Sequence, residues 1–165
     1  MVRRVLQDIP AKAVAMETGI GVDTFYKASK GSRKLPQDRD ARRKFSNLHP
    51  CAGLAVAQED TGWEMFGYIE GDRHIQTLIQ ICLKEDSEVD EQLAGLSRIL
   101  IGKIQPADLS PDDVKMLKGV VKEVSEEIRS LLNFIIGLDE HYELGVINMI
   151  KNTEDTRPGK ARCLR

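Results

Sequence analysis

A short stretch near the start of the chain holds the residues best suited to chemistry with a partner. It reads ETGIGVDTFYKASKGSRKLP, residues 17–36, and gathers four cations beside one tyrosine: Lys27, Lys30, Arg33 and Lys34. Ammonium and guanidinium groups bind phosphate oxygens and donate to guanine O6 and N7, and a tyrosine can contact a phosphate or a thymine methyl group. The stretch therefore indicates an anionic partner, with double-stranded DNA as the first hypothesis.

The charge of the chain is divided unevenly along its length. The formal net charge is −2, yet residues 1–50 hold 11 Lys/Arg against 5 Asp/Glu, whereas residues 51–156 hold 9 Lys/Arg against 21 Asp/Glu. A basic head on an acidic body is common in small DNA-binding proteins, because attraction to phosphate is useful on one face only. The same division is compatible with an ordinary two-domain protein.

Other kinds of site have little support in the sequence. It contains no Gly-rich phosphate loop, nucleophile elbow or His-Glu-x-x-His motif, so we expect no catalytic residue and no cofactor. The histidines lack partners at metal-ligand spacing, so we expect no metal site. The three cysteines lie outside any Cys-x-x-Cys pair and are predicted to be reduced thiols: Cys51, Cys82 and Cys163. The absence of a long apolar run predicts a cytoplasmic protein without a membrane span.

Apolar residues recur mostly at intervals of three and four, and no useful length alternates as a β-strand would. The sequence therefore predicts an all-α fold, with head helices at about residues 2–7, 10–18, 22–30, 37–47 and 50–60. Asp72 is the expected N-cap of the next helical stretch, which is either one bent helix or two. The motif SPDD at residues 110–113 predicts the start of the last helix, and Gly137 and Gly145 are expected to interrupt its end.

Three segments follow from this pattern. Residues 1–62 form the predicted helix-turn-helix DNA-binding domain. Residues 63–150 form a predicted helical domain for oligomerisation or interaction, built as a helical hairpin or one long helix, and residues 151–165 a flexible basic tail. The linker is placed at residues 63–72, because that stretch holds three aromatic residues and two glycines without a clear helical period.

The opening stretch has the spacing of two short helices that cross at a tight turn. Val14 would lie inside the first helix, Gly19 would make the turn and Ile20 would fill the space beneath it. In the second helix, Phe25 and Ala28 would face inward. The remaining residues of this second helix are then predicted to face outward.

That outward face carries the candidate DNA contacts. Lys27 can donate to guanine and Asp23 can accept from a cytosine amino group. The predicted base-reading residues are Asp23, Tyr26, Lys27 and Lys30, and the predicted phosphate contacts are Lys12, Thr24, Arg33, Lys34, Arg42, Arg43 and Lys44. Simpler alternatives stay open: Asp23 complements the helix dipole, Tyr26 packs on a neighbouring helix, and the cations only keep a helical hairpin soluble.

The residues VAMETGIGVDTFYKASKG, 14–31, resemble the lambda-repressor-like, or Xre-type, helix-turn-helix regulators of bacteria and their phages. The resemblance extends over about residues 2–60, with Gly21 standing where Ser or Thr usually caps the recognition helix. It implies a sequence-specific transcriptional regulator that reads the major groove of double-stranded DNA. It also implies a dimer or higher oligomer, since one such head contacts only one half-site.

The last helix carries an apolar stripe with a period close to a heptad. Its simplest interpretation is a core, and the functional one is an oligomer seam made by Val121, Val124, Ile128, Leu131, Leu132 and Ile135. A second hypothesis for the whole protein is a protein–protein adaptor or antirepressor that acts through the acidic C-terminal helices.

Overall fold

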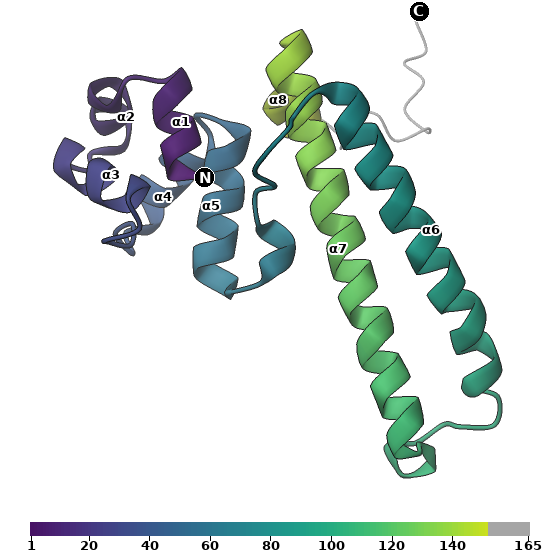
Figure 1. Cartoon of the computed structure of the whole chain (residues 1–165). Helices are drawn as coiled ribbons and strands as arrows, with labels where there is room; N and C mark the ends of the chain where they lie inside the picture. The colour runs from purple at the N-terminus through teal and green to yellow at the C-terminus, as the bar shows by residue number, and fades with distance from the viewer. Residues whose placement is uncertain (152–165) are drawn as a thin grey trace, which may run out of the picture.

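The computed structural model describes residues 1–151 of the chain. Within them it is all-helical and has no strand, so the predicted all-α class is confirmed for this part (Figure 1). The predicted basic tail and Cys163 lie outside the described residues. The elements are α1 (Val2–Asp8), α2 (Ala11–Thr18), α3 (Val22–Ser29), α4 (Arg39–Ser46), α5 (Pro50–Thr61), η1 (Glu64–Phe66), α6 (Ile75–Ile99), η2 (Pro106–Asp108), α7 (Pro111–Tyr142) and α8 (Val146–Lys151). Over this range, no helix combines the length and apolar character needed to cross a bilayer.

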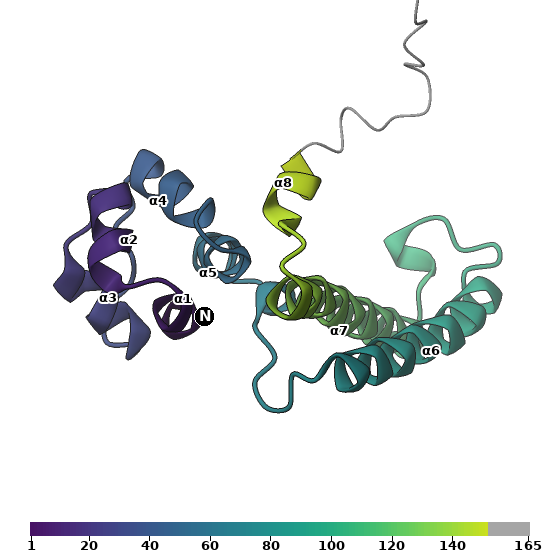
Figure 2. The ribbon, with the colours of Figure 1, turned by 90° about the horizontal axis from the view of Figure 1, so that it is seen from above.

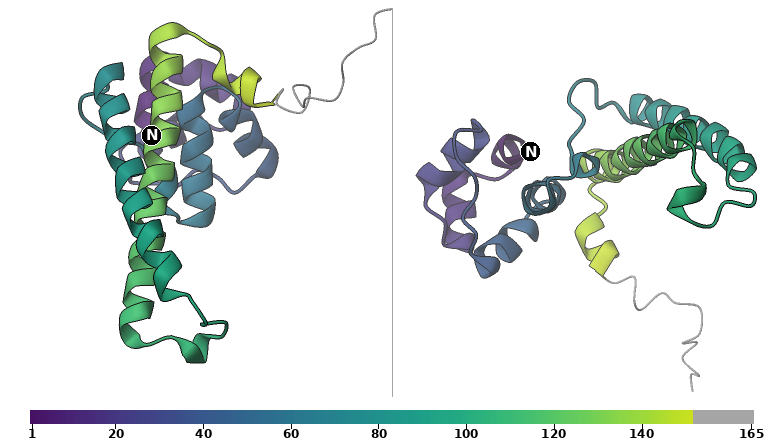
Figure 3. Two further views of the ribbon diagram at one scale, coloured as in Figure 1. Left: turned by 90° about the vertical axis from the view of Figure 1, so that its right-hand side faces the viewer. Right: turned by 90° about the horizontal axis from the view of Figure 1, so that it is seen from below.

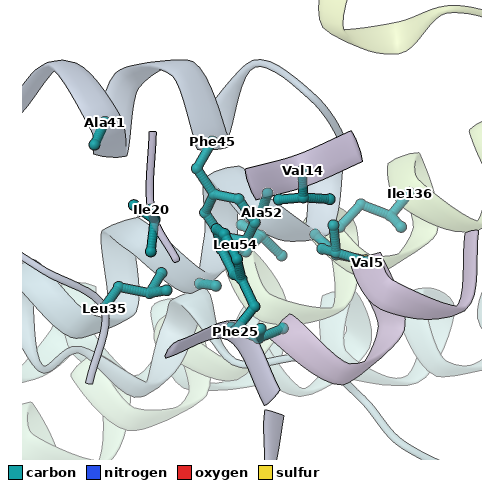
Figure 4. Packing of buried hydrophobic residues seen from close by; sticks show 13 residues of the cluster. Val5, Val14, Ile20, Phe25, Leu35, Ala41, Phe45, Ala52, Leu54 and Ile136 are labelled. Atoms are coloured by element: carbon teal, nitrogen blue, oxygen red, sulfur yellow. The ribbon is translucent and has the colours of Figure 1, made fainter. Parts of the chain in front are cut away.

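The first five helices close around an aromatic pair. The rings of Phe25 and Phe45 are fully buried with centroids 5.3 Å apart, and Val5 and Val14 pack beside them without exposure to solvent (Figure 4). Burying each such ring contributes about 1.5–3 kcal/mol, so this pair is a major source of stability for the head. The same cluster also includes Ile136 of α7, which means that the head shares its core with the last long helix.

Local signals set the ends of the head helices. Gly19 and Gly62 follow α2 and α5 with φ of 74° and 72°, a left-handed conformation that glycine adopts without steric cost. At the start of α5, the ring of His49 accepts a hydrogen bond at Nδ1 from the backbone N–H of Cys51, at 3.0 Å. The predicted bounds of all five head helices agree with the structure to within two residues.

Helices α6 and α7 form a long antiparallel hairpin beside the head, and its loop end extends past the head (Figures 1 and 3). α6 is one continuous helix. Gly137 does not interrupt α7, so that prediction is wrong. Leu78 of α6 packs where a side chain at position 137 would stand, and the glycine therefore permits close helix contact. α7 instead ends at Tyr142 and is followed by Glu143, which has a left-handed φ of 52°.

The predicted start of α7 agrees with the structure, whereas the predicted N-cap of α6 does not. α7 begins as expected with a capping box, in which Ser110 Oγ accepts from the N–H of Asp113 at 3.2 Å and Asp113 Oδ2 accepts from the N–H of Ser110 at 2.7 Å. The predicted N-cap Asp72 is wrong. His74 caps α6 by accepting from the N–H of Gln76, while Asp72 accepts from the N–H of His74 and supports the turn before the helix.

Residues 67–69, here called the strap, are bound to α7 by side chains from one face of that helix. Asn133 is fully buried; its Oδ1 accepts from the N–H of Ile69 at 2.8 Å and its Nδ2 donates to the carbonyl of Gly67 at 2.9 Å. Arg129 donates to the carbonyls of Gly67 and Tyr68 at 3.3 and 3.1 Å. The backbone groups in the middle of the predicted linker 63–72 are therefore hydrogen-bonded to side chains of α7.

Glu140, one α7 turn beyond Ile136, joins the head to the hairpin. Its side chain is only 9% exposed and lies 3.2 Å from Arg4 Nε of α1 and 3.0 Å from Arg73 Nε just before α6. Tyr68 of the strap donates its hydroxyl to Glu140 Oε1 at 3.4 Å, and burial raises the pKa of this phenol to about 12, which keeps it protonated. One carboxylate of α7 thus binds both α1 and the stretch from the strap to the start of α6.

We predict that Glu140→Gln destabilises the protein by about 3 kcal/mol, because it leaves the largely buried guanidinium of Arg73 and the partly exposed guanidinium of Arg4 without their shared counter-charge. Urea unfolding followed by far-UV circular dichroism measures the change. The matched control is Glu91→Gln, an exposed position on α6, which should shift the free energy of unfolding by less than about 0.5 kcal/mol. Equal effects of the two substitutions would contradict the role given to Glu140.

A second prediction concerns the start of α7. Hydrogen bonds from Lys103 and Ser110 lower the pKa of Asp113 to about 2. A depressed carboxyl pKa contributes stability that is present above the ordinary pKa and is lost as pH falls through the folded value. Asp113→Asn should therefore lower the urea midpoint at neutral pH, and the gap to the parent protein should narrow between about pH 5 and pH 2. A difference in urea midpoint that stays constant over this pH range would contradict the role given to Asp113.

Candidate nucleic-acid interface

The turn between α2 and α3 is held by hydrogen bonds of Thr18 and by the buried side chain of Ile20. The hydroxyl of Thr18 donates to the carbonyl of Val14 at 2.7 Å and accepts from the N–H of Ile20 at 3.2 Å. Ile20 is buried beneath the turn, as predicted, next to the Phe25 cluster. The signal for Thr18 was present in the sequence, because a Thr near a helix C-terminus often bonds to the carbonyl four residues earlier.

The outward side of α3 is exposed where the sequence predicts base contacts. Asp23, Tyr26, Lys27 and Lys30 are all exposed, and α3 lies at the end of the head away from the hairpin (Figures 1 and 2). Tyr26 is 53% exposed, so its ring is not buried against a neighbouring helix. With Phe25 turned fully inward, the helix has one packed side and one side available to a partner.

Two of the predicted base-reading residues are paired with each other. Lys27 Nζ lies 2.7 Å from Asp23 Oδ2, one helical turn away, and both side chains are more than half exposed. Pairs of this kind on a helix surface contribute only about 0.3–0.5 kcal/mol. A stronger acceptor can therefore take Lys27 from Asp23 at little energetic cost.

The segment after α3 places two further cations beside it. Ser32 donates from both its N–H and its hydroxyl to the carbonyl of Lys27 at 3.0 Å, which closes the end of the helix. Leu35 is then buried and its N–H donates to Glu59 Oε2 at 3.3 Å. Arg33 and Lys34, between these anchors, are exposed.

Arg42 is a correction to the predicted phosphate contacts. It is only 5% exposed; its Nη2 lies 2.7 Å from Asp60 Oδ1 and 3.4 Å from Glu59 Oε2. Its guanidinium also donates to the carbonyls of Pro36 and Val56. Arg42 therefore holds the segment after α3 against α5 and cannot reach a phosphate. Its Nε is buried without a partner, a cost that the other bonds must offset.

The remaining predicted phosphate contacts are distributed over three helices. Lys12 is exposed on α2, and Thr24 is partly buried in the first turn of α3. Arg43 and Lys44 are exposed on α4, where Arg43 lies 3.4 Å from Asp40. α4 packs mainly against α2 and α5, and its Phe45 also contacts Phe25 of α3. The role of Arg43 and Lys44 stays a prediction.

The predicted oligomer seam is divided by the structure. Leu132 packs against the core of the head, so its assignment to the seam is corrected to an intramolecular contact. Ile135 lines a hollow with Leu54 of α5 and Val146 of α8. The other seam residues, Val121, Val124, Ile128 and Leu131, are not buried by the described part of the chain.

The hairpin also contains a group of carboxylates that the sequence did not predict. Oxygen atoms of Glu85, Glu88 and Glu123 lie within 4.8 Å of one another, in the described part of the chain. Lys84 Nζ approaches Glu85 and Glu88 at 3.1 and 3.0 Å, and Lys122 Nζ approaches Glu123 at 3.3 Å. These lysines compensate the charge, and the group is visible only once α6 and α7 are paired.

We predict that Arg42→Gln destabilises the protein by about 2–4 kcal/mol, because the change removes a buried charge from two carboxylates and from the carbonyls of Leu35, Pro36 and Val56. Arg43→Gln is the control on the same helix. Its exposed ion pair should contribute less than about 0.5 kcal/mol. Thermal unfolding of both variants measures the difference, and a greater loss for Arg43→Gln would refute the assignment of Arg42.

Comparisons with known proteins add no further information about this site. No protein family, no curated protein and no solved structure matches the chain. The interpretation of the α3 surface therefore depends on the geometry and charges described above.

Proposed function

We propose that the protein binds double-stranded DNA in a sequence-specific manner and regulates transcription, with α3 as the helix that enters the major groove. The observation that supports this most directly is the exposed side of α3. It offers Lys27, Asp23 and Tyr26 to a partner, while Phe25 fixes the opposite side in the core. A helix held in this way can present side chains to base edges in a defined register.

The dimensions and charges agree with such a role. An α-helix with its side chains is about 10–12 Å across, which fits the width of about 12 Å of the major groove, and the 8 residues of α3 form about two turns. On approach, Lys27 exchanges Asp23 for guanine O6 or N7, and the freed carboxylate can accept from a cytosine amino group. Arg33 and Lys34 follow the helix and hold the phosphates beside the groove.

An adaptor or antirepressor function is the alternative, and the exposed apolar residues of the hairpin, such as Val121 and Leu131, favour it. Deleting residues 1–48 would not separate the two proposals, because α7 shares its core with the head and Glu140 binds Arg4. Point substitutions in exposed residues of α3 leave these contacts intact. They therefore test DNA binding without disturbing the hairpin.

We predict that the full-length protein binds duplexes selected from random DNA at low salt. If Lys12, Arg33, Lys34, Arg43 and Lys44 each neutralise one phosphate, log affinity should fall against log salt with a slope of about −4.5 per head. Lys27→Ala should weaken binding by about 5- to 150-fold through one base pair, corresponding to about 1–3 kcal/mol. Arg33→Ala should weaken all sequences alike. Fluorescence anisotropy of labelled duplexes measures both effects.

The control variant is Lys115→Ala, which removes an exposed cation from α7 at a distance from α3 in sequence and should leave affinity unchanged. Loss of Lys27 should change the preferred base at one position, whereas loss of Arg33 should not. Absence of binding to every duplex at low salt would exclude the proposed function and leave the adaptor alternative.

A further inference from the structure

The hollow that Ile135 lines has a volume of about 290 Å³ and lies where the head, the end of α7 and α8 meet. Its walls are three lengths of helix, each of about one turn: residues 50–54 of α5, 132–136 of α7 and 146–150 of α8. Ser46 and Asn47, at the C-terminal end of α4, complete its edge. None of the residues that line it belongs to α3 or α6, so the hollow is separate from the candidate DNA surface.

α8 forms one wall because the chain turns sharply after α7. Gly145 has a left-handed φ of 66°, and the N–H of Val146 donates to Asp139 Oδ1 at 3.0 Å. Figure 2 shows that α8 then leaves the end of α7 on the side away from α6. Val146 is buried and lines the hollow together with Leu54 of α5, so the start of α8 is held in place beside the head.

Gly53 forms part of the floor of the hollow, and nothing in its own helix requires a glycine. It lies in the interior of α5, where glycine is less favourable than alanine because it loses more backbone entropy on folding. A Cβ at this position would meet only the carbonyl oxygen of Ser46, at 3.7 Å, which is an ordinary van der Waals distance. The effect of Gly53 is to leave bare backbone at the hollow, where a bound molecule can approach closely.

The chemistry of the walls selects an uncharged molecule. Among the described residues, the hollow is lined by leucine, isoleucine and valine side chains with Pro50 and Gly53, and by no ionised group or aromatic ring. A charged molecule would lose hydration here without gaining a counter-charge. At the edge, Ser46 Oγ donates to the carbonyl of Arg43 at 2.9 Å, which leaves its lone pairs to accept from one hydroxyl group of a ligand.

The size and shape of the hollow narrow the class further. An apolar cavity of about 150 Å³ holds one benzene molecule, so about 290 Å³ takes about eleven or twelve non-hydrogen atoms. Each helical wall extends only about 6 Å along its axis, at about 1.5 Å per residue. A compact ring skeleton fits such a space better than an extended chain does.

We propose that this hollow is a binding site for a compact, uncharged ring hydrocarbon of about ten carbons that carries one hydroxyl group. The aliphatic side chains bury the skeleton, the bare backbone at Gly53 gives it room, and Ser46 Oγ accepts from its hydroxyl. The bound molecule contacts α5, α7 and α8 together and stabilises their packing. The site does not rest on the proposed DNA contact.

The test uses the full-length chain and menthol, a cyclic alcohol of this size. Isothermal titration calorimetry should give one site per chain, and ordinary binding energy per atom predicts a Kd on the order of 100 µM. A molecule that binds only the folded state raises the unfolding temperature. Menthol at about ten times its Kd should therefore raise Tm by about 3–6 °C.

Two comparison molecules test the class of ligand. 1-Decanol has as many non-hydrogen atoms as menthol in an extended chain, and decanoate adds a negative charge to such a chain. Each should bind at least about tenfold more weakly than menthol, because the first does not match the short walls and the second gains no counter-charge. Equal or tighter binding of either molecule would contradict the class assigned to the site.

Gly53→Leu fills the hollow from its floor and should weaken menthol binding by at least about tenfold. The matched control is Gly95→Leu, the same change at a glycine of α6, where a Cβ would meet nothing within 4 Å. It should leave the affinity unchanged. Ser46→Ala removes the accepting hydroxyl and should weaken binding by about 2- to 12-fold, which provides a second route if Gly53→Leu loses helix content.

Absence of saturable menthol binding to the parent protein overturns the inference. An affinity that is unchanged in those of the two hollow variants, Gly53→Leu and Ser46→Ala, that keep their far-UV circular dichroism overturns it as well. All of these measurements are made without DNA, so their outcome and that of the duplex-binding experiments are independent.

Discussion

The structure depends on the carboxylate of Glu140, which lies largely buried between two guanidinium groups. Arg4 reaches it from the first helix, where it also lies 3.6 Å from Asp8, and Arg73 reaches it from the approach to α6; each gains this partner only when its segment has docked on α7. Removing one member of such a group leaves a poorly solvated charge, so the contact favours the fully assembled state over any partly docked one. Head and hairpin are thereby coupled, even though the basic and acidic parts of the sequence suggest two independent units.

α7 couples the head to the hairpin because different sides of this helix contact different segments of the chain. Gly137 permits close contact with α6, and Asn133 and Glu140 bind the strap and the head. The hydrogen bonds of Asn133 satisfy strap backbone groups that would otherwise be buried without partners, at a cost of about 1–3 kcal/mol each. The apolar stripe is covered only in part by the described residues: Ile135 lines a hollow with Leu54, and Val121 lines one with Trp63. The contacts of α7 cannot be predicted from its hydrophobic period alone, since its contact with α6 depends on a glycine and its contacts with the strap and the head are polar.

The sequence predicted those features that are determined within a few residues and failed where the partner is distant. Gly19, Pro50 and the capping box at Ser110 act locally, so the bounds of the head helices and the start of α7 were recovered. Arg42 was assigned to phosphate because it lies in a basic run, yet its partners Glu59 and Asp60 come from the next helix. Leu132 and Gly137 were misassigned for the same reason: their neighbours are α1–α5 and Leu78, which no local pattern identifies.

The coupling also bears on how the proposed DNA contact would work. A recognition helix on a flexible linker would search a wide volume and gain little from a second copy, because the effective concentration falls as the linker lengthens. Here the strap is bound to α7 along its backbone, and Glu140 ties α1 to the same helix. The position of the α3 surface relative to the hairpin is therefore held by the strap and by the buried carboxylate of Glu140, whereas a flexible linker would leave it undefined.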